Sequence, residues 1–357
     1  MEDFMMEFED LIEQAYDLPN GAAKIALLER AAEIADLAGD AEAGYEAREA
    51  IVEAASFGGF PMKAIVAYSW MLGQYDRNPD AFDAHTLHWS YKWVIDDVPS
   101  FPDVPAEQIE SLLQDLRRRY QAYGAGERTY WYYNFRLAMY MGDLGKAGES
   151  LGEFGKLKKD EMSDCSACEL DEQVRYLLLT GQDEAAVRKA KPIVDGRESC
   201  AHVPHATLPF LLLPLHRLGR TEEAEAMQPK SYRLIRDNLQ FTHEFGEHLG
   251  YLSIVDPQRG LPLLERHLPQ VETHEDPLNR MMFGLNAAAL LSKLIRTGEP
   301  FVLNLPPSSR FYELADRPDE LRANLESEAF GTAAALDRRN GNAYYTEYGR
   351  NLLKERG

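Results

Sequence analysis

The chain has 357 residues, of which 45% are hydrophobic, and its formal net charge is −21. A surface this acidic repels a phosphate backbone, which argues against a nucleic-acid-binding protein. The most apolar stretch, Leu208 to Leu215, is too short to span a bilayer and contains two prolines, so we expect no membrane segment.

Helix-forming residues dominate the composition, and we predict an all-α protein. One local pattern recurs: an apolar helix ends at a glycine, and a small residue follows five positions later. The pairs are Gly59 and Ala64, Gly142 and Ala147, Gly181 and Ala186, Gly219 and Ala224, with a weaker copy at Gly39 and Gly44. Glycine accepts the left-handed backbone that ends a helix, and alanine lets two helices cross closely. Asp143, Asp183 and Thr221, just after these turns, are candidates to cap the next helix.

The last three glycines are 39 and 38 residues apart, a length typical of helix–turn–helix repeats. The clearest copy runs from Trp131 to Phe154 and has a large aromatic residue, a glycine, a small residue and a late apolar pair. With these residues the chain resembles the tetratricopeptide repeat (TPR) superfamily, with degenerate repeats over about residues 20–240. The resemblance implies a right-handed α-solenoid, which we expect to occupy residues 1–298.

Further helices are expected at about 242–254, 257–270 and 277–297. Pro209 and Pro214 predict a kink or a late start in the helix that contains them. The segment 299–318 is rich in proline and is predicted to be a long loop. Two helices, at about 319–339 and 344–355, would then form a capping pair over residues 319–357, which covers the last open face of the stack.

All three cysteines fall within one stretch, as Cys165-x2-Cys168 and, 31 residues later, Cys200 followed by His202 and His205. The N-terminal segment lacks the basic region of a secretory signal, so we expect a cytoplasmic protein, in which disulfides are disfavoured. Three thiolates and one imidazole are a common ligand set for structural zinc. Chance clustering and redox chemistry are the alternatives to this interpretation.

The fourth zinc ligand is predicted to be His205, with His202 as the alternative. Cys168 and His205 lie 13 and 14 residues before the glycines of their own repeats, which places them at the starts of successive first helices. His205 also follows Pro204, a residue favoured at the first position of a helix. A zinc ion there would tie two neighbouring repeats together.

An aromatic run around Trp131 is the best candidate for partner binding. By analogy with tetratricopeptide proteins, Tyr132, Arg136 and Tyr140 would line the concave groove, together with Arg175 from the next repeat. Arg136 and Arg175 each lie six residues before the glycine of their repeat, so the two guanidinium groups could clamp a carboxylate of the partner.

No catalytic motif is recognised, so the prediction is a non-enzymatic scaffold that binds a protein or peptide and contains structural zinc. This function rests on the analogy between folds. A bacterial peptide-sensing regulator of the TPR type is an alternative, although no basic helix-turn-helix module is visible. A zinc enzyme is a third possibility and would need an open coordination position at the metal.

Overall fold

The computed structural model describes residues 2–357, with side chains from Met5 onwards. Within these residues the chain is all-helical and contains no β-strand, which confirms the predicted all-α class. The α-helices are α1 (Glu2–Tyr16), α2 (Ala22–Ala38), α3 (Ala41–Ser56), α4 (Pro61–Arg77), α5 (Ala84–Asp97), α6 (Ala106–Tyr123), α7 (Glu127–Tyr140), α8 (Leu144–Phe154), α9 (Ser166–Leu179), α10 (Asp183–Lys189), α11 (Lys191–Val194), α12 (Leu208–Arg217), α13 (Thr221–Ile235), α14 (Thr242–Val255), α15 (Pro257–Val271), α16 (Pro277–Arg296), α17 (Pro318–Asn340) and α18 (Tyr344–Arg356).

The four clear glycine turns lie between paired helices, as the sequence predicts. They link α3 to α4, α7 to α8, α9 to α10 and α12 to α13. Each glycine has a left-handed backbone, with φ between +72° and +86°, and each alanine five positions later is 0% exposed. The spacing of glycine and alanine therefore correctly indicates a tight helical hairpin at all four turns.

The caps predicted after these turns are only partly correct. Asp143 caps α8, because its carboxylate accepts the Lys146 amide at 2.9 Å. Asp183 and Thr221 are instead the first residues of α10 and α13, and the side chain of neither is a cap. Asp183 binds the Arg217 guanidinium at 2.6 and 2.9 Å, so this carboxylate is used in an ion pair.

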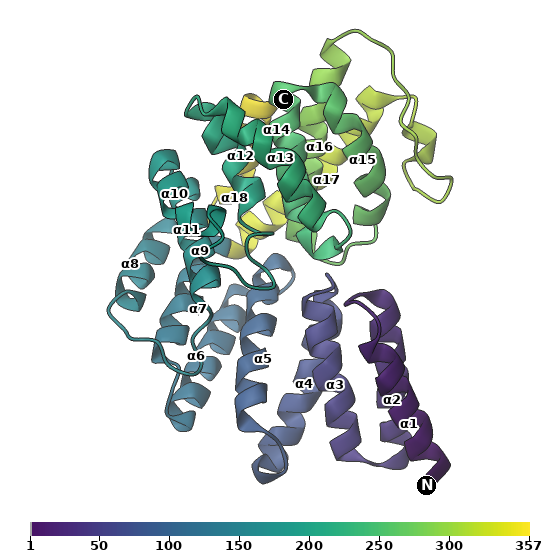
Figure 1. The fold of residues 1–357 in the computed structure, drawn as a ribbon, viewed down its shortest axis with the longest axis vertical. Coiled ribbons are helices and arrows are strands. Elements are labelled where there is room, and N and C mark those ends of the chain that lie inside the picture. Colours follow the sequence, from purple (N-terminus) through teal and green to yellow (C-terminus); the bar gives the residue numbers. More distant parts are fainter. Residues whose placement is uncertain (1) are drawn as a thin grey trace.

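Consecutive helices pack side by side, and alternate helices also contact one another. In the first part of the chain, α3 contacts α5, α5 contacts α7, and α7 contacts α9. In the C-terminal part, α12 contacts α14, α14 contacts α16, and α16 contacts α18. In Figure 1, α1 to α5 stand side by side in one row, and the helices from α12 onwards lie above that row. A hydrogen bond of 3.2 Å from Asn238 to the Phe57 carbonyl joins the two parts directly.

Helix α16 is the centre of the C-terminal part. Thirteen of its twenty residues are buried, since α14, α15, α17 and α18 all pack against it. A helix that is buried on most of its surface needs apolar or small residues almost all round, and α16 supplies them with leucine, methionine and alanine.

The C-terminal helix pair also reaches back to the middle of the chain. The Arg339 guanidinium donates to the Pro99 and Phe101 carbonyls at 2.7 and 3.0 Å. The Tyr345 hydroxyl donates to the Tyr140 carbonyl at 2.6 Å, at the end of α7. The two predicted helices are thus present, and they pack against the body of the molecule at several places.

Pro209 and Pro214 both lie in α12, and Pro214 is in the interior of this helix. Helix α12 begins late, at Leu208, so Pro209 lies in its first turn, where no backbone N–H is required. The segment between α16 and α17 contains no α-helix. It is nonetheless held in place, because Leu303 and Phe311 are buried in the core beside α15 and α16.

Candidate metal centre

The C-x2-C motif forms the start of α9. Cys165 is the residue that caps this helix, and its Sγ accepts the Cys168 amide at 3.4 Å. Cys168 follows in the first turn. Both positions agree with the prediction that the motif lies at the beginning of a first helix.

Cys200 comes from the irregular segment before α12. Its Sγ accepts two backbone amides, from His202 at 3.4 Å and from Val203 at 3.3 Å. Amide donors of this kind fix the position of a sulfur. Backbone amides therefore donate to a cysteine sulfur both at the start of α9 and in the segment before α12.

The fold brings the three sulfurs together. All three Sγ atoms lie within 4.8 Å of one another, and Cys168 and Cys200 are 3.5 Å apart. The side chains of Ala167, Ile193 and Val203 pack around this group and are almost fully buried. A triangle of thiols drawn from residues 165–200 of the sequence is a donor set that fits a soft or borderline metal cation.

Burial raises the pKa of the Cys168 thiol, and the neighbouring Cys165 and Cys200 raise it further. Three thiols this close do not ionise together unless a cation compensates their charge. A metal ion at the centre of the triangle would supply that charge and hold all three as thiolates.

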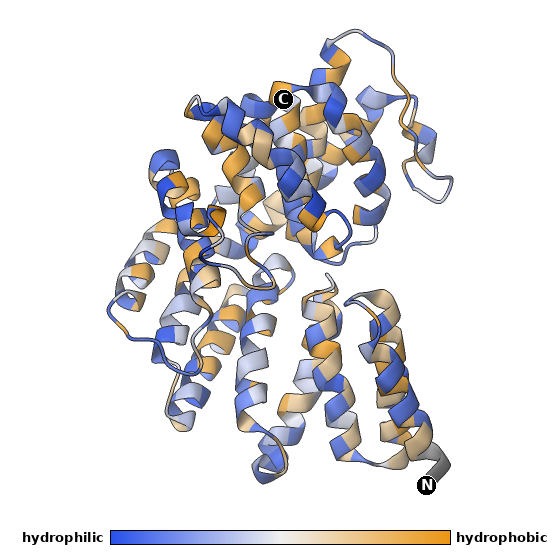
Figure 2. Ribbon diagram, viewed as in Figure 1, coloured by the Kyte–Doolittle hydropathy of each residue, from blue (hydrophilic) through white to orange (hydrophobic). Residues whose placement is uncertain are grey.

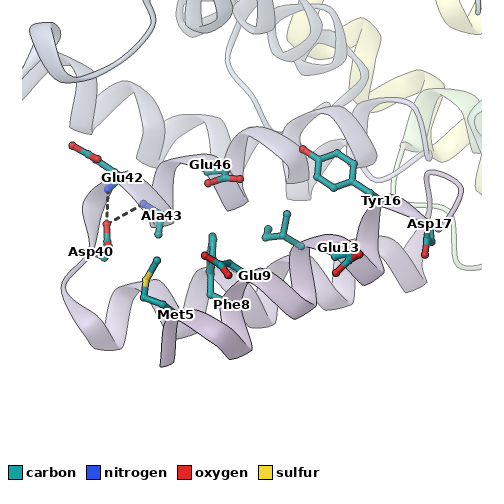
Figure 3. A pocket seen from close by; sticks show the side chains of 11 residues that line it. Met5, Phe8, Glu9, Glu13, Tyr16, Asp17, Asp40, Glu42, Ala43 and Glu46 are labelled. Carbon is teal, nitrogen blue, oxygen red and sulfur yellow. Dashed lines mark hydrogen bonds between the residues drawn. The ribbon is translucent and has the colours of Figure 1, made fainter. Parts of the chain in front are cut away.

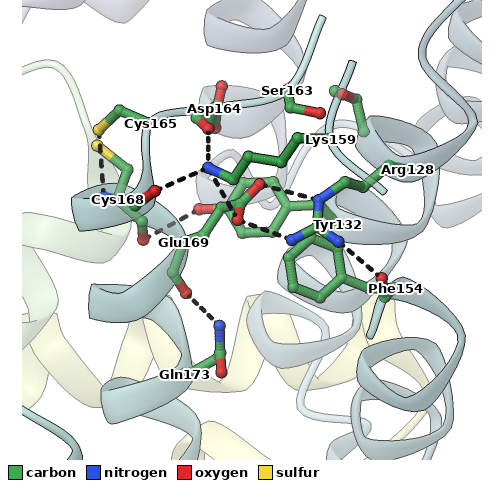
Figure 4. A network of polar contacts seen from close by, with 12 residues as sticks. Arg128, Tyr132, Phe154, Lys159, Ser163, Asp164, Cys165, Cys168, Glu169 and Gln173 are labelled. Carbon is green, nitrogen blue, oxygen red and sulfur yellow. Dashed lines mark hydrogen bonds and ion pairs between the residues drawn. The ribbon is translucent and has the colours of Figure 1, made fainter. Parts of the chain in front are cut away.

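A polar network fixes the segment that carries Cys165 (Figure 4). Glu169, only 5% exposed, accepts Arg128 Nη2 at 2.8 Å and pairs with Lys159 Nζ at 3.2 Å. Lys159 also donates to the Asp164 carbonyl at 2.8 Å. The fully buried Lys92 donates to the Asp164 carboxylate at 2.6 Å. These bonds hold the residues on either side of Cys165 in place.

Neither predicted histidine ligand joins the sulfur group in the described residues. The His202 ring is 2.6 Å from the Gln240 amide and stacks on Phe241, with 5.5 Å between ring centroids. His205 stacks on Phe241 at 5.8 Å, and its Nδ1 is buried without a partner. His205 also precedes the first residue of α12 by three positions, so the predicted helix start at Pro204 is wrong. The aromatic ring of Phe241, 36 residues further along the chain, decides where both imidazoles lie.

The predicted partner groove is occupied by the protein itself. Tyr132 is 1% exposed, and its hydroxyl donates to the Cys168 carbonyl at 3.3 Å. Arg136 pairs with Asp96 at 2.6 Å and with Glu172 at 3.0 Å. The predicted carboxylate clamp is thus filled by carboxylates of the chain.

The other two predicted groove residues are also engaged. Arg175 pairs with Glu244 at 2.9 Å, and the partly buried Tyr140 side chain packs against the apolar cluster formed by α16, α17 and α18. Burial raises the pKa of Asp96 and of Glu244 to about 7, although the arginine beside each carboxylate opposes that rise. Buried charges of this kind stabilise one packing arrangement and do not offer an open surface.

An open hollow lies elsewhere, between α1 and α3, and the sequence analysis did not single it out. It measures about 610 Å³ (Figure 3). Phe8, Ile12 and Ala43 are its buried apolar lining, and the partly exposed Met5 and Tyr16 also line it. The remaining lining residues are all acidic: Glu9, Glu13, Asp17, Asp40, Glu42 and Glu46. We call this hollow the acidic groove.

Among the described side chains, five of the six carboxylates in the acidic groove form no ion pair and cap no helix. Asp40 is used in capping α3, since it accepts the Glu42 and Ala43 amides. Within the described side chains, no lysine, arginine or histidine forms an ion pair with any of the other five. The signal in the sequence was the spacing of Glu9, Glu13 and Asp17, four residues apart beside an apolar stripe.

No protein-family model matches the chain, and no curated protein matches it either. Within the described residues, no helix has the length and apolarity needed to cross a membrane, and Figure 2 shows hydrophilic residues interrupting the apolar ones along the visible helices. Function is therefore inferred from the metal centre and the acidic groove.

Proposed function

We propose that the chain is a non-catalytic scaffold of TPR-like repeats that binds a basic, amphipathic helical segment of a partner protein in the acidic groove. The observation that supports this most directly is the set of five unpaired carboxylates around an apolar floor. The remaining repeats, stacked as a solenoid, would hold this groove in a fixed shape.

The charge pattern of the groove identifies the kind of partner. Glu9 and Glu13 are four residues apart on α1, and like charges at that spacing destabilise a helix by about 0.2–0.5 kcal/mol. A partner with lysine or arginine beside its apolar residues would neutralise these charges and cover Phe8 and Ile12 in the same step. Amphipathic helices bind grooves in this way, with apolar anchors spaced three or four residues apart.

The metal centre contributes to architecture in this proposal. A zinc ion held by Cys165, Cys168 and Cys200 would join the start of α9 to the segment that precedes α12. It would thereby fix two neighbouring repeats where the backbone between α11 and α12 is irregular. Zinc is the proposed ion because it accepts thiolate ligands and has no redox chemistry of its own.

A synthetic amphipathic peptide of lysine, leucine and alanine tests the groove. We expect the full-length protein to bind it in a calorimetric titration, and the affinity to fall as salt is added. The double variant Glu13→Lys/Glu46→Lys, with one change on each wall, should weaken binding by at least about tenfold, or ~1.4 kcal/mol. Each new lysine lies four residues from a remaining glutamate, so the variant should fold at least as well as the parent.

The control must have the same net charge. Glu149 and Glu161 are exposed and lie outside the groove, so Glu149→Lys/Glu161→Lys makes an equal change elsewhere. A scrambled peptide of identical composition controls for simple attraction to an acidic protein. Equal weakening in the two double variants, or equal binding of the two peptides, would refute the proposed site.

A further inference from the structure

We infer that the metal centre is a three-thiolate site whose fourth coordination position is filled from outside the chain, by a small exchangeable donor such as water or a thiol. This deepens the structural zinc site proposed above and depends on it. It also replaces the closed site with a histidine ligand that the sequence predicts.

The donor set is the first reason. Among the described residues, Cys165, Cys168 and Cys200 form the one group of three or more metal-binding side chains whose ligand atoms lie mutually within 4.8 Å. Zinc bound by proteins is almost always four-coordinate. Three protein ligands therefore leave one position for a donor from solution.

The contacts of the histidines are the second reason. His202 would have to give up the Gln240 amide at 2.6 Å and the Phe241 ring before it could turn toward the sulfurs. Its backbone is fixed as well, because the His202 amide already donates to Cys200 Sγ. His205 stacks on the same Phe241 ring, and neither of its ring nitrogens belongs to the group of ligand atoms that lie within 4.8 Å of one another.

Access to solvent is the third reason. The Cys165 side chain is exposed, whereas Cys168 and Cys200 are partly buried against Ile193 and Val203. The triangle of sulfurs is thus open on the side of Cys165 and closed by apolar side chains around the other two. A small molecule can reach the metal from the open side without any change in the helices.

Cobalt(II) provides a direct test, since it replaces zinc in thiolate sites and its absorption bands report the number and kind of ligands. The full-length protein should bind one equivalent, with sulfur-to-metal charge-transfer bands and the visible bands of tetrahedral coordination. Addition of 2-mercaptoethanol, and separately of azide, should shift the visible bands. The two additions distinguish a position that accepts only thiols from one that accepts any small donor.

Variants of each predicted ligand complete the test. His202→Ala and His205→Ala should leave the spectrum unchanged and the zinc dissociation constant within about twofold of the parent value, because even an outer-sphere partner of a ligand usually contributes about 10- to 100-fold. Cys165→Ser should weaken zinc binding by more than that range. Serine is itself a good helix cap, so α9 should still form and the loss would report ligation.

Three results would overturn the inference. A spectrum that changes in either histidine variant would indicate a closed site with that imidazole as the fourth ligand. Visible bands that respond to neither mercaptoethanol nor azide would indicate that another group of the protein completes the coordination. Failure of the parent protein to bind cobalt or zinc would remove the metal site and leave the peptide-binding proposal to its own test.

Discussion

Gly142 and Gly219 end the first helices of two hairpins with nearly the same backbone, at φ +73° and +75°. Their surroundings differ. A Cβ atom at Gly142 would lie 2.5 Å from the Tyr344 side chain, whereas a Cβ at Gly219 meets nothing within 4 Å. We expect Gly219→Ala to lower the free energy of unfolding by about 1–2 kcal/mol, because only the strain of a left-handed alanine is added. Gly142→Ala should lower the free energy of unfolding by that amount and by about 1–3 kcal/mol more, because its methyl group is overpacked against Tyr344.

Urea unfolding of the two variants measures this difference. The double variant Gly142→Ala/Tyr344→Ala should lose less stability than the sum of its single changes, since the clash is then absent. Equal losses in the two glycine variants, or strict additivity in the double variant, would contradict the close approach between α18 and the turn after α7.

At the scale of elements, Arg356 connects α18 to two other helices. Its Nη1 donates to Glu247 of α14 at 3.0 Å and to Asn286 of α16 at 2.6 Å, and all three residues are buried. Arg356→Met would leave the Glu247 carboxylate buried without its main partner. Removal of one member of a buried ion pair typically costs about 3–5 kcal/mol, so we expect a loss of that size in the free energy of unfolding.

An exposed pair provides the comparison. Arg220 and Glu223 have side chains 44% and 56% exposed, and Arg220→Met should change stability by no more than about 1 kcal/mol. If the loss in Arg356→Met arises from the stranded carboxylate, Glu247→Gln should restore part of it. A double variant no more stable than Arg356→Met would show that packing of the arginine side chain, and not its charge, matters.

The elements differ in how well the sequence could predict them. The hairpins follow from local chemistry, because a left-handed glycine and a buried alanine are decided within a dozen residues. The grouping of the cysteines was also foreseen, since the repeat spacing places Cys168 at the start of one first helix and Cys200 in the segment that leads into the next. The position of His205 could not be predicted, because Phe241 from a later helix fixes it.

The structure differs from the predicted concave groove around Tyr132 for a related reason. Tyr132 and Arg136 have the residue types of a peptide-binding stripe, but the carboxylates that occupy Arg136 come from α5 and α9. Nothing within one repeat indicates that neighbouring helices will supply these partners. In the sequence, the acidic groove corresponds only to a row of like charges on α1. The second wall of the groove comes from α3, whose position the sequence alone does not indicate.

For the whole molecule, buried histidines should set the response to acid. Burial lowers the pKa of His243 and His248 to about 3, and that of His202 and His267 to about 4. Unfolded histidine has a pKa of about 6.5, so below this pH the unfolded chain binds protons that the folded chain does not. Stability from these groups is complete above pH ~6.5 and is lost as the pH falls toward the folded pKa values.

Buried carboxyl groups with raised pKa values, among them Asp96 and Glu244, act in the opposite direction. The folded pKa of about 7 for Asp96 and Glu244 exceeds their unfolded values, so their contribution falls as pH rises through the window up to about 7. Proton uptake by the unfolded histidines lowers the urea midpoint as the pH falls from 6.5 to 4, and the carboxyls with raised pKa values counteract this fall. His248→Gln should flatten this dependence by up to ~1.4 kcal/mol per pH unit, and Glu244→Gln should steepen it.

The prediction is tested by comparing the variants, because protonation of the three cysteines would release a bound metal equally from all of the proteins. Urea midpoints measured at several pH values for the parent and the two variants are sufficient. Parallel curves for all three proteins would contradict the assignment of proton uptake to His248 and Glu244.

The return of the C-terminal helices to α7 has a consequence for synthesis in the cell. The Tyr345 hydroxyl and the Tyr140 carbonyl that it binds are 205 residues apart in the chain. At about 5–20 residues per second, a ribosome makes the second partner roughly 10–40 s after the first. From their own synthesis until α18 is made, the faces of α14 and α16 that α18 covers are exposed to solvent. Each nascent chain therefore passes through a stage at which the apolar core around α16 is open and prone to association, and the synthesis of α18 ends that stage.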